Sequence, residues 1–254
     1  MMRTAFFSWI TDNWINTTID YDNFYNSFKK FHPDIDLIVF KSKDFEDLVA
    51  QKPWINSDNC KASFAKLLYN DYDLLVNVDT DFYFFDRLEE VLAGDYDIAA
   101  CANFNNLCNV NLVGGVIDGY DIPSVSEVDY IQGGLVASTK KEFWDDYDQI
   151  SKDLAKKLPL RENDTLNAIW HSNKYKVKVL DGDVDFRSAN FKQYYNCASL
   201  NEIHNAKIID DKVYLNGKPM RSYHVAHGHQ HKPRIDEIFP KDVSNWFYNK
   251  VYGK

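Results

Sequence analysis

Long hydrophobic runs are missing from this chain of 254 residues. No stretch approaches the roughly 18 consecutive apolar residues of a transmembrane helix. Residues 1–14 also lack the basic and then apolar segments of a secretory signal peptide. We therefore expect a cytoplasmic protein without a transmembrane segment, while export by a route that uses no such signal stays open.

A surplus of positive charge is missing as well. The 29 Lys and Arg residues are outnumbered by 38 Asp and Glu residues, which gives a formal net charge of −9 at pH 7. An acidic chain has no general attraction for a phosphate backbone, so we expect no nucleic-acid partner.

Cysteine is scarce, with four residues, and no two of them have the C-x-x-C spacing. This spacing is typical of zinc and redox sites, so neither is predicted from the cysteines. We interpret Cys60, Cys101, Cys108 and Cys197 as reduced structural thiols in a reducing compartment.

Aromatic residues, in contrast, are abundant, with 17 Phe, 16 Tyr and 6 Trp. We expect most of them in the hydrophobic core and some along a sugar-binding cleft, because aromatic faces stack on sugar rings. The chain is long enough for one substantial core, and no linker or repeat divides it. We predict a single domain over residues 1–254, with a nucleotide-binding half at about 1–102 and a half for acceptor and donor sugar at about 103–254.

Apolar strand patterns and helical patterns alternate along the first half of the chain. Strands are predicted at 3–9, 35–40, 74–78 and 97–102, and helices at 16–31, 45–50, 59–70 and 88–93. This alternation is typical of an α/β fold with a mostly parallel central sheet flanked by helices.

The second half begins with an irregular segment, 103–128, which we interpret as a loop or a hairpin insertion. Further strands are predicted at 130–138 and 175–180, helices at 140–157, 162–172 and 243–252, and a hairpin over 207–220 that turns at Asn216-Gly217.

Two aspartates follow directly after an apolar strand. Residues 74–78 read Leu-Leu-Val-Asn-Val, and Asp79 and Asp81 come next, before the aromatic run 82–85. Side chains two residues apart at a strand end can aim at one point, and carboxylates are ligands that Mg²⁺ and Mn²⁺ prefer. Open α/β sheets bind ligands at the carboxyl ends of their strands. The pattern predicts a metal site for a substrate diphosphate, and a structural turn is the alternative.

The same aspartates also fit a phosphatase pattern. Haloacid-dehalogenase-like phosphatases carry Asp-x-Asp-x-Thr/Val at the end of the first strand, where the first Asp is a nucleophile. Here Tyr83 stands in place of Thr or Val, and the motif follows roughly the third predicted strand. Both differences disfavour this alternative.

The helix and strand around the acid pair resemble a known family. Residues 61–68 read Lys-Ala-Ser-Phe-Ala-Lys-Leu-Leu, and the strand and Asp79-Thr80-Asp81 follow. This order is similar to that in glycosyltransferases of the GT-A (Rossmann-like) fold, most of all the retaining family eight, which includes glycogenin and lipopolysaccharide galactosyltransferases. The resemblance implies a UDP-hexose donor, Mn²⁺ or Mg²⁺, and a glycan, lipid-linked or protein acceptor.

The same resemblance makes Lys61 and Lys66 candidate donor-binding residues. It implies that Lys66 approaches the donor sugar or its diphosphate and that Asp79 also contacts the ribose. The family usually has arginine where Lys66 stands, and lysine lacks the planar, bidentate group of arginine. A solvated helix face is the alternative for both lysines.

A second similar segment is Gln132-Gly133-Gly134 at the start of the strand over 130–138. In the family this place holds Asn, a small residue and Gly, which implies donor binding by Gln132, Gly133 and Gly134. Glycine lets the backbone come close to a ligand, and a plain β-bulge is the alternative.

A third similar segment is Glu162-Asn163-Asp164 at a helix start. The resemblance implies that Asp164 binds donor-sugar hydroxyls and that Asn163 lies on the reacting face of the sugar, so both are catalytic candidates. An ordinary acidic helix N-terminus, favoured by the helix dipole, is the alternative.

The fourth segment, 223–233, holds four of the seven histidines. The family has a His that completes the metal site and a Lys-Pro whose lysine reaches the diphosphate. We therefore choose His224 as third metal ligand, with His227 as its rival, and Lys232 as diphosphate ligand. The spacing is not the usual one, and a separate zinc site in this His-rich tract is the alternative.

Together these patterns predict a metal-dependent hexosyltransferase that uses a nucleotide diphosphate sugar and retains the anomeric configuration. One alternative is a non-catalytic nucleotide- or glycan-binding module of the same fold. Another is a sugar-phosphate nucleotidyltransferase, which would carry a Gly-rich, basic loop after the first strand. Residues 8–13 contain neither Gly nor Lys, which disfavours it.

Overall fold

The computed structural model describes residues 2–13, 20–57, 59–102, 115–122, 130–154, 157–158, 162–182, 184, 200–225 and 235–253. Its centre is a six-stranded sheet in the order β2-β1-β3-β8-β5-β9. The strands are β1 (Thr4–Trp9), β2 (Asp36–Phe40), β3 (Leu74–Val78), β5 (Ile98–Ala102), β8 (Ile131–Ser138) and β9 (Val177–Leu180). Only β8 runs antiparallel to its neighbours β3 and β5 among these six, so the predicted mostly parallel sheet is confirmed.

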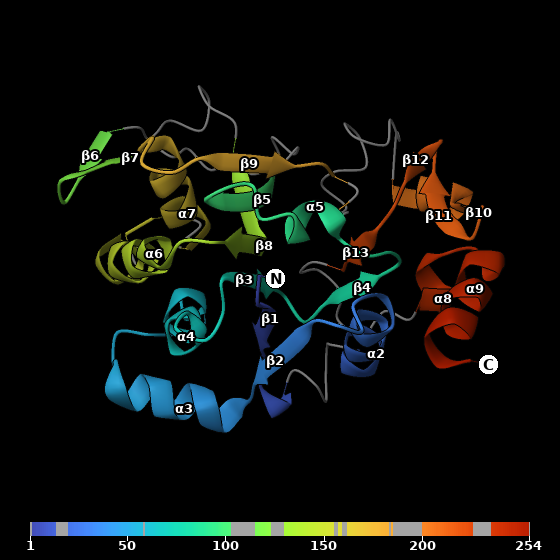
Figure 1. The fold of residues 1–254 in the computed structure, drawn as a ribbon, viewed down its shortest axis with the longest axis horizontal. Helices are drawn as coiled ribbons and strands as arrows, with labels where there is room; N and C mark the ends of the chain where they lie inside the picture. Colours follow the sequence, from blue (N-terminus) through green and yellow to red (C-terminus); the bar gives the residue numbers. More distant parts are fainter. Residues whose placement is uncertain are drawn as a thin grey trace.

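Helices cover both faces of this sheet (Figure 1). One face packs against α3 (Ser42–Gln51), α4 (Lys61–Leu68), α6 (Lys141–Leu154) and α7 (Glu162–His171), and the other against α2 (Tyr21–Phe31) and α5 (Glu89–Leu92). Since both faces are covered, every residue of β3 is buried, which explains its continuous apolar pattern. The α/β architecture predicted from the sequence is confirmed.

The large aromatic residues fill the two interfaces between the helices and the sheet. Phe7 on β1 meets the edge of Trp144 on α6, and on the opposite face Phe6 packs against Phe28 of α2. All four are nearly or fully buried. Adjacent residues of a strand point to opposite faces, so a run of two phenylalanines supplies both halves of the core.

A smaller C-terminal unit packs beside the sheet (Figure 1). It contains a 3₁₀ helix (Leu200–Asn205), β10 (Lys207–Ile209), β11 (Lys212–Leu215), β12 (Lys218–Pro219), α8 (Ile235–Ile238) and α9 (Lys241–Tyr252). The Asn216-Gly217 turn was predicted, and both residues have positive φ values, 50° and 79°. The expected hairpin is instead a three-stranded sheet, because Asp210 and Asp211 make another turn with φ values of 47° and 63°.

One strand pair was not foreseen from the sequence. The short β4 (Phe82–Phe84) pairs antiparallel with β13 (Ser222–His224), so the aromatic run after the acid pair joins the C-terminal part of the chain. Within 103–128 the structure describes a hairpin of β6 (Gly115–Ile117) and β7 (Tyr120–Ile122).

Cys60 and Cys101 are fully buried, whereas Cys108 and Cys197 lie outside the described residues. Among the helices that the structure describes, none combines the length and the apolar composition needed to cross a bilayer.

Candidate metal and donor site

Strand β3 delivers two carboxylates to its C-terminal end. Asp79 follows the last residue of the strand, and its backbone N–H donates to the carbonyl of Gly134 on β8 at 2.9 Å. Ser8 Oγ donates to the carbonyl of Val78 at 2.6 Å, which anchors the same point from β1. The Asp79 side chain is 30% exposed and that of Asp81 20%, so both can still reach solvent or a ligand.

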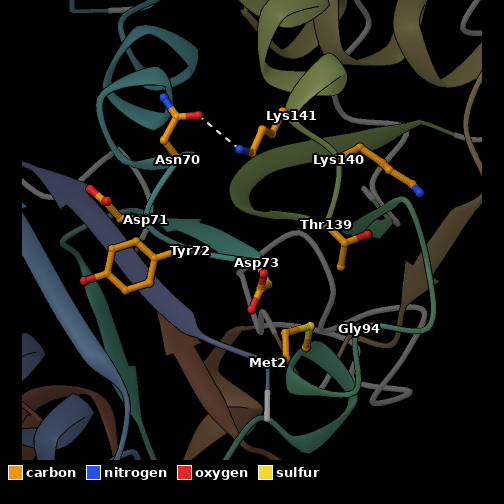
Figure 2. Close-up of a pocket in the computed structure, with 9 residues that line it drawn as sticks. All are labelled: Met2, Asn70, Asp71, Tyr72, Asp73, Gly94, Thr139, Lys140 and Lys141. Carbon is orange, nitrogen blue, oxygen red and sulfur yellow. Dashed lines mark hydrogen bonds between the residues drawn. The ribbon is translucent and has the colours of Figure 1, made fainter.

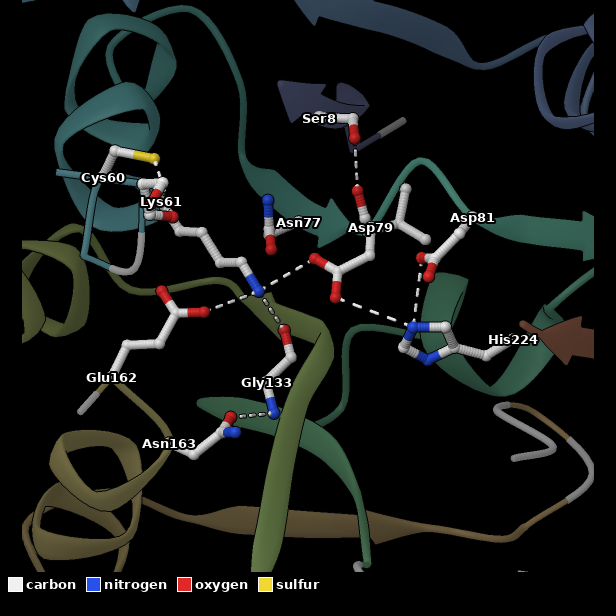
Figure 3. A network of polar contacts seen from close by, with 12 residues as sticks. Ser8, Cys60, Lys61, Asn77, Asp79, Asp81, Gly133, Glu162, Asn163 and His224 are labelled. Carbon is white, nitrogen blue, oxygen red and sulfur yellow. Dashed lines mark hydrogen bonds and ion pairs between the residues drawn. The ribbon is translucent and has the colours of Figure 1, made fainter. Parts of the chain in front are cut away.

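The strand pair β4–β13 brings His224 to the acid pair. In its register His224 lies opposite Phe82, and the imidazole stacks on the Phe82 ring with 4.3 Å between centroids. The backbone N–H of Val225 donates to the carbonyl of Asp81 at 3.0 Å. His224 Nε2 lies 3.1 Å from Asp81 Oδ1 and 3.7 Å from Asp79 Oδ2 (Figure 3).

These three side chains form a set that fits a divalent cation. Asp79, Asp81 and His224 each offer one ligand atom, and these atoms lie within 4.8 Å of one another. Two carboxylates and an imidazole suit Mn²⁺, and Mg²⁺ or Mn²⁺ would leave positions for water or phosphate oxygens. His224 is almost fully buried, so its position is fixed before any ligand arrives.

A buried lysine lies on the other side of Asp79. Lys61 Nζ, on α4, is 2.8 Å from Asp79 Oδ1 and 2.9 Å from Glu162 Oε1 on α7. It also donates to the carbonyl of Gly133 at 2.8 Å (Figure 3). Asp79 thus contacts Lys61 through Oδ1, while its Oδ2 faces His224.

The charges of this cluster depend on each other. Burial alone would lower the pKa of Lys61, but the carboxylates of Asp79 and Glu162 outweigh it and raise that pKa well above its ordinary value. Burial raises the pKa of Glu162 to about 7, although Lys61 acts in the opposite direction. Lys61 therefore keeps its charge at neutral pH and partly compensates the acidic cluster.

The glycine-rich start of β8 bulges toward this cluster. The register between β5 and β8 shifts between the pairs Ala100↔Val136 and Ala102↔Ile131. The amide of Gly133, inside the bulge, donates to Asn163 Oδ1 at 2.8 Å, and a Cβ on Gly133 would lie 2.7 Å from that oxygen. We call this irregularity of register the bulge of β8, and within it the Gly133 carbonyl lies against Lys61.

The first turn of α7 is engaged with β8 rather than open. Asp164 is fully buried and its Oδ1 accepts a hydrogen bond from Tyr130 at 2.8 Å, while Asn163 binds the Gly133 amide. Gln132 is buried as well. Asn163 therefore adjoins the cluster through Gly133, whereas Asp164 contacts Tyr130, and the contacts that we describe for both catalytic candidates are structural ones.

Of the remaining predicted residues, Lys66 is described by the structure and is not brought together with this cluster. Lys66 Nζ pairs with Asp145 at 2.8 Å and Asp148 at 3.3 Å, both on α6. Lys232 and His227 lie outside the described residues. The structure thus selects Lys61 as the lysine of α4 that adjoins Asp79.

Glu162 belongs to the cluster but was not among the predicted site residues. Its Oε1 pairs with Lys61, and its Oε2 is buried with no hydrogen-bond partner among the described residues. The sequence feature that could have identified Glu162 is its position directly before Asn163-Asp164, in a segment that resembles the family.

A hollow lies at the opposite end of β3 (Figure 2). It measures about 410 Å³ and is lined by Asp73 and Gly94, among others. Lys141 donates to Asn70 at 3.0 Å there, and Asp73 accepts from the backbone N–H of Arg3. Tyr72 and Thr139 in its lining donate to Asp36 and to the carbonyl of Tyr96. Several of its polar groups thus already have protein partners, and it lies at the amino end of the strand whose carboxyl end carries the acid pair.

No protein-family model matches the chain, and no curated protein matches its sequence. Solved structures are similar in fold. The galactosyltransferase LgtC, in complex with donor and acceptor sugar analogues, superposes with a TM-score of 0.52 at 15% identity, over 98% of this chain and 95% of that one.

Two further structures agree with this result. The bifunctional glycosyltransferase WbbM has a TM-score of 0.55 at 15% identity, and all of this chain spans 50% of its length. The glycosyltransferase GlyE of Streptococcus pneumoniae TIGR4 has a TM-score of 0.53 at 12% identity, over 98% of this chain and 61% of that one. The chain has the GT-A fold that these glycosyltransferases share.

Proposed function

We propose that the protein is a metal-dependent glycosyltransferase that moves a hexose from a nucleotide diphosphate sugar to a hydroxyl acceptor. The observation that carries this proposal is the convergence of Asp79, Asp81 and His224 at the carboxyl end of β3 in a GT-A fold. Ligands of open α/β sheets bind at this end. Asp79 follows directly after the buried strand β3, and Asp81 lies in the turn that leads to β4. We propose Mn²⁺ or Mg²⁺ as the ion and UDP-hexose as the donor.

Departure of a nucleoside diphosphate builds negative charge on its terminal phosphate. A bound divalent cation would supply the compensating positive charge. The chain's own residues prepare this place: Lys61 holds Asp79 by Oδ1, and the β4–β13 pair holds His224 against Asp81. Charges fixed before the reaction lower the cost of reorganisation in the transition state.

The sugar would lie toward the bulge of β8 and the first turn of α7. Glu162 offers a buried carboxylate oxygen there, and Gly133 lets the backbone approach closely. Gln132, Gly134, Asn163 and Asp164 belong to the same proposed donor pocket. Lys232 is proposed for the diphosphate, and for α4 we favour Lys61 over Lys66 because Lys61 adjoins Asp79.

We further propose retention of the anomeric configuration, as in glycosyltransferase family eight. The support is the order of the four similar motifs in the sequence and the fold similarity to LgtC. With retention the acceptor attacks from the face that the diphosphate leaves. The departing phosphate can then take the acceptor's proton, so this route requires no protein base.

Thermal-shift measurements with a panel of nucleotide sugars, with and without Mn²⁺, test this function directly. We expect a UDP-hexose to stabilise the protein only when Mn²⁺ is present, because the diphosphate is held through the ion. Slow hydrolysis of that donor should follow under the same conditions. Absence of any Mn²⁺-dependent stabilisation across the panel would contradict the proposal.

A non-catalytic binding module of the same fold is the second candidate. The observation that favours it is the engagement of Asn163 and Asp164 in contacts with Gly133 and Tyr130. Such a module would bind the nucleotide with Mn²⁺ and leave the donor intact. Measured turnover of the stabilising donor therefore separates the two candidates.

The cytoplasmic location of the protein stays a prediction.

A further inference from the structure

Asn167 is a fully buried amide on α7, one turn after Asn163. Its Oδ1 accepts from the backbone N–H of Ile131 at 2.8 Å, and its Nδ2 donates to the carbonyl of the same residue at 2.7 Å. The Nδ2 also donates to the carbonyl of Asn163 at 2.7 Å. A single side chain thus joins the start of β8 to the first turn of α7.

These bonds lie where the pairing between β3 and β8 has ended. The last register pair of the two strands is Val78↔Leu135, and the next bond runs from Asp79 to Gly134. Ile131 lies beyond that point, across the bulge. A side-chain amide offers the same donor and acceptor as a peptide group, so Asn167 takes the role of a further strand residue.

Four direct contacts connect the bulge that Asn167 anchors to the donor site. The Gly133 amide donates a hydrogen bond to Asn163 Oδ1, and Lys61 Nζ donates one to the Gly133 carbonyl at 2.8 Å. Lys61 in turn pairs with Asp79 and Glu162. A shift of α7 relative to β8 would therefore displace Asn163 and Glu162 from Gly133 and Lys61, whereas Asp79 stays held to β8 by its backbone bond to Gly134.

We propose that Asn167 is a positioning residue for the donor sugar. It locks the first turn of α7 to the bulge of β8, so that Glu162, Asn163 and Lys61 face the sugar in one fixed arrangement. This inference rests on the proposed glycosyl transfer. Small displacements of positioned groups reduce turnover much more than they reduce binding of the distant parts of a substrate.

The metal side of the site is held by other contacts. Asp81 and His224 are brought together by the β4–β13 pair and the bond from Val225 to Asp81. Loss of Asn167 should therefore leave the binding of Mn²⁺ and of UDP, which has no sugar, largely intact. This contrast distinguishes positioning of the sugar from general support of the fold.

The test is the variant Asn167→Ala in the full chain, with three measurements. Amide hydrogen exchange at Ile131 and Gly133 should become at least about fivefold faster relative to the rest of β8, since one bond is lost and its neighbour loosens. The kcat of Mn²⁺-dependent UDP-hexose hydrolysis should fall by about tenfold or more. The Kd values of Mn²⁺ and UDP should change by less than about threefold.

Ser138→Ala is the matched control at the far end of the same strand. Ser138 is also buried, and its Oγ donates to the carbonyl of Asp97 at 2.7 Å, so a buried side chain-to-backbone bond is again removed. We expect Ser138→Ala to lower stability to a similar degree. It should leave exchange at Gly133 and donor turnover unchanged.

Gly133→Ala disturbs the contact between β8 and Asn163 from the strand side. It serves as the second variant if Asn167→Ala does not fold. The new Cβ would lie 2.7 Å from Asn163 Oδ1 and 3.8 Å from Lys61 Nζ. It should reproduce the loss of turnover with Mn²⁺ and UDP binding retained. A wild-type kcat in either Asn167→Ala or Gly133→Ala would overturn the positioning role. So would a loss of turnover in these variants that is no larger than the loss in Ser138→Ala.

Failure of the proposed function gives a different result. If wild-type protein neither binds UDP with Mn²⁺ nor hydrolyses any donor, glycosyl transfer is wrong. Amide exchange at Gly133 would still test whether Asn167 anchors the bulge of β8, because this measurement needs no substrate. Unchanged exchange would refute the link between Asn167 and the bulge.

Discussion

Asp81 carries the clearest test at the scale of single residues. Asp81→Asn keeps the size of the side chain but replaces a carboxylate by an amide, which is a poorer ligand for a hard cation. We expect Mn²⁺-dependent donor hydrolysis to fall by about 100-fold, with a melting temperature close to wild type. The assay is UDP-hexose hydrolysis at saturating Mn²⁺, and activity within threefold of wild type would remove the metal role of Asp81.

The choice of histidine is also a single-residue question. His224 lies against Asp81 in the structure, whereas His229 lies outside the described residues. We expect His224→Ala to weaken Mn²⁺ binding about tenfold or more, and His229→Ala to weaken it less. Titration of Mn²⁺ by electron paramagnetic resonance gives both affinities. A larger loss in His229→Ala would move the ligand assignment from His224 to His229.

The two lysines of α4 show the limit of sequence analysis at this scale. Lys61 and Lys66 are five residues apart, so they point about 140° apart around a helix with 100° per residue. The sequence names both as candidates, but only the packing of α4 against β3 and α6 decides which faces the acid pair. Lys61 does so, while Lys66 pairs with Asp145.

At the scale of elements, β4 is the feature that links the acid pair to its histidine. Phe82 and Phe84 are both fully buried on this strand and belong to the same hydrophobic cluster. Phe82 stacks on His224, whereas Phe84 packs on Phe24, Phe28 and His32 of the α2 region. Each side chain therefore supports the core, but only Phe82 orients the imidazole.

We predict that Phe82→Leu and Phe84→Leu lower the free energy of unfolding by similar amounts, about 1–2 kcal/mol. Only Phe82→Leu should weaken Mn²⁺ binding, by a few-fold, because His224 loses its stacking partner. Urea unfolding and Mn²⁺ titration of the two variants check this. Equal Mn²⁺ affinities in both would show that the strand backbone alone positions His224.

The elements themselves were predictable to different degrees. The strand over 74–78 is apolar except for Asn77, and the structure has it at those residues. The three-residue β4 has no such signal, because its partner β13 is more than a hundred residues away in the sequence. Short strands of this kind are stabilised by pairing and burial rather than by their own pattern.

At the scale of the whole molecule, two buried groups give opposite dependences of stability on pH. Burial, reinforced by Arg87, lowers the pKa of His32 from 6.5 to about 3, so its contribution is complete above pH 6.5 and is lost as the pH falls. Burial raises the pKa of Glu162 from 4.5 to about 7, so its contribution is lost as the pH rises through that range.

We therefore predict a flat profile of stability for wild type between about pH 5 and pH 6.5, because the two slopes oppose each other. His32→Gln removes the first slope, while the Gln oxygen can still accept from the backbone N–H of Leu88 as His32 does. The stability of this variant should fall with rising pH, by up to about 1.4 kcal/mol per unit. Urea unfolding at several pH values measures it, and parallel profiles for the two proteins would contradict the burial of a neutral His32.

The sequence by itself determined the alternation of strands and helices, the α/β class and the acid pair after a buried strand. These are local properties, since periodicity and a strand end can be recognised within a few neighbouring residues. Only the tertiary structure decided that His224 meets Asp81, that Lys61 rather than Lys66 adjoins Asp79, and that Asn167 spans the bulge of β8. Those contacts join segments far apart in the chain, and they exist because strand pairing and helix packing bring the segments together.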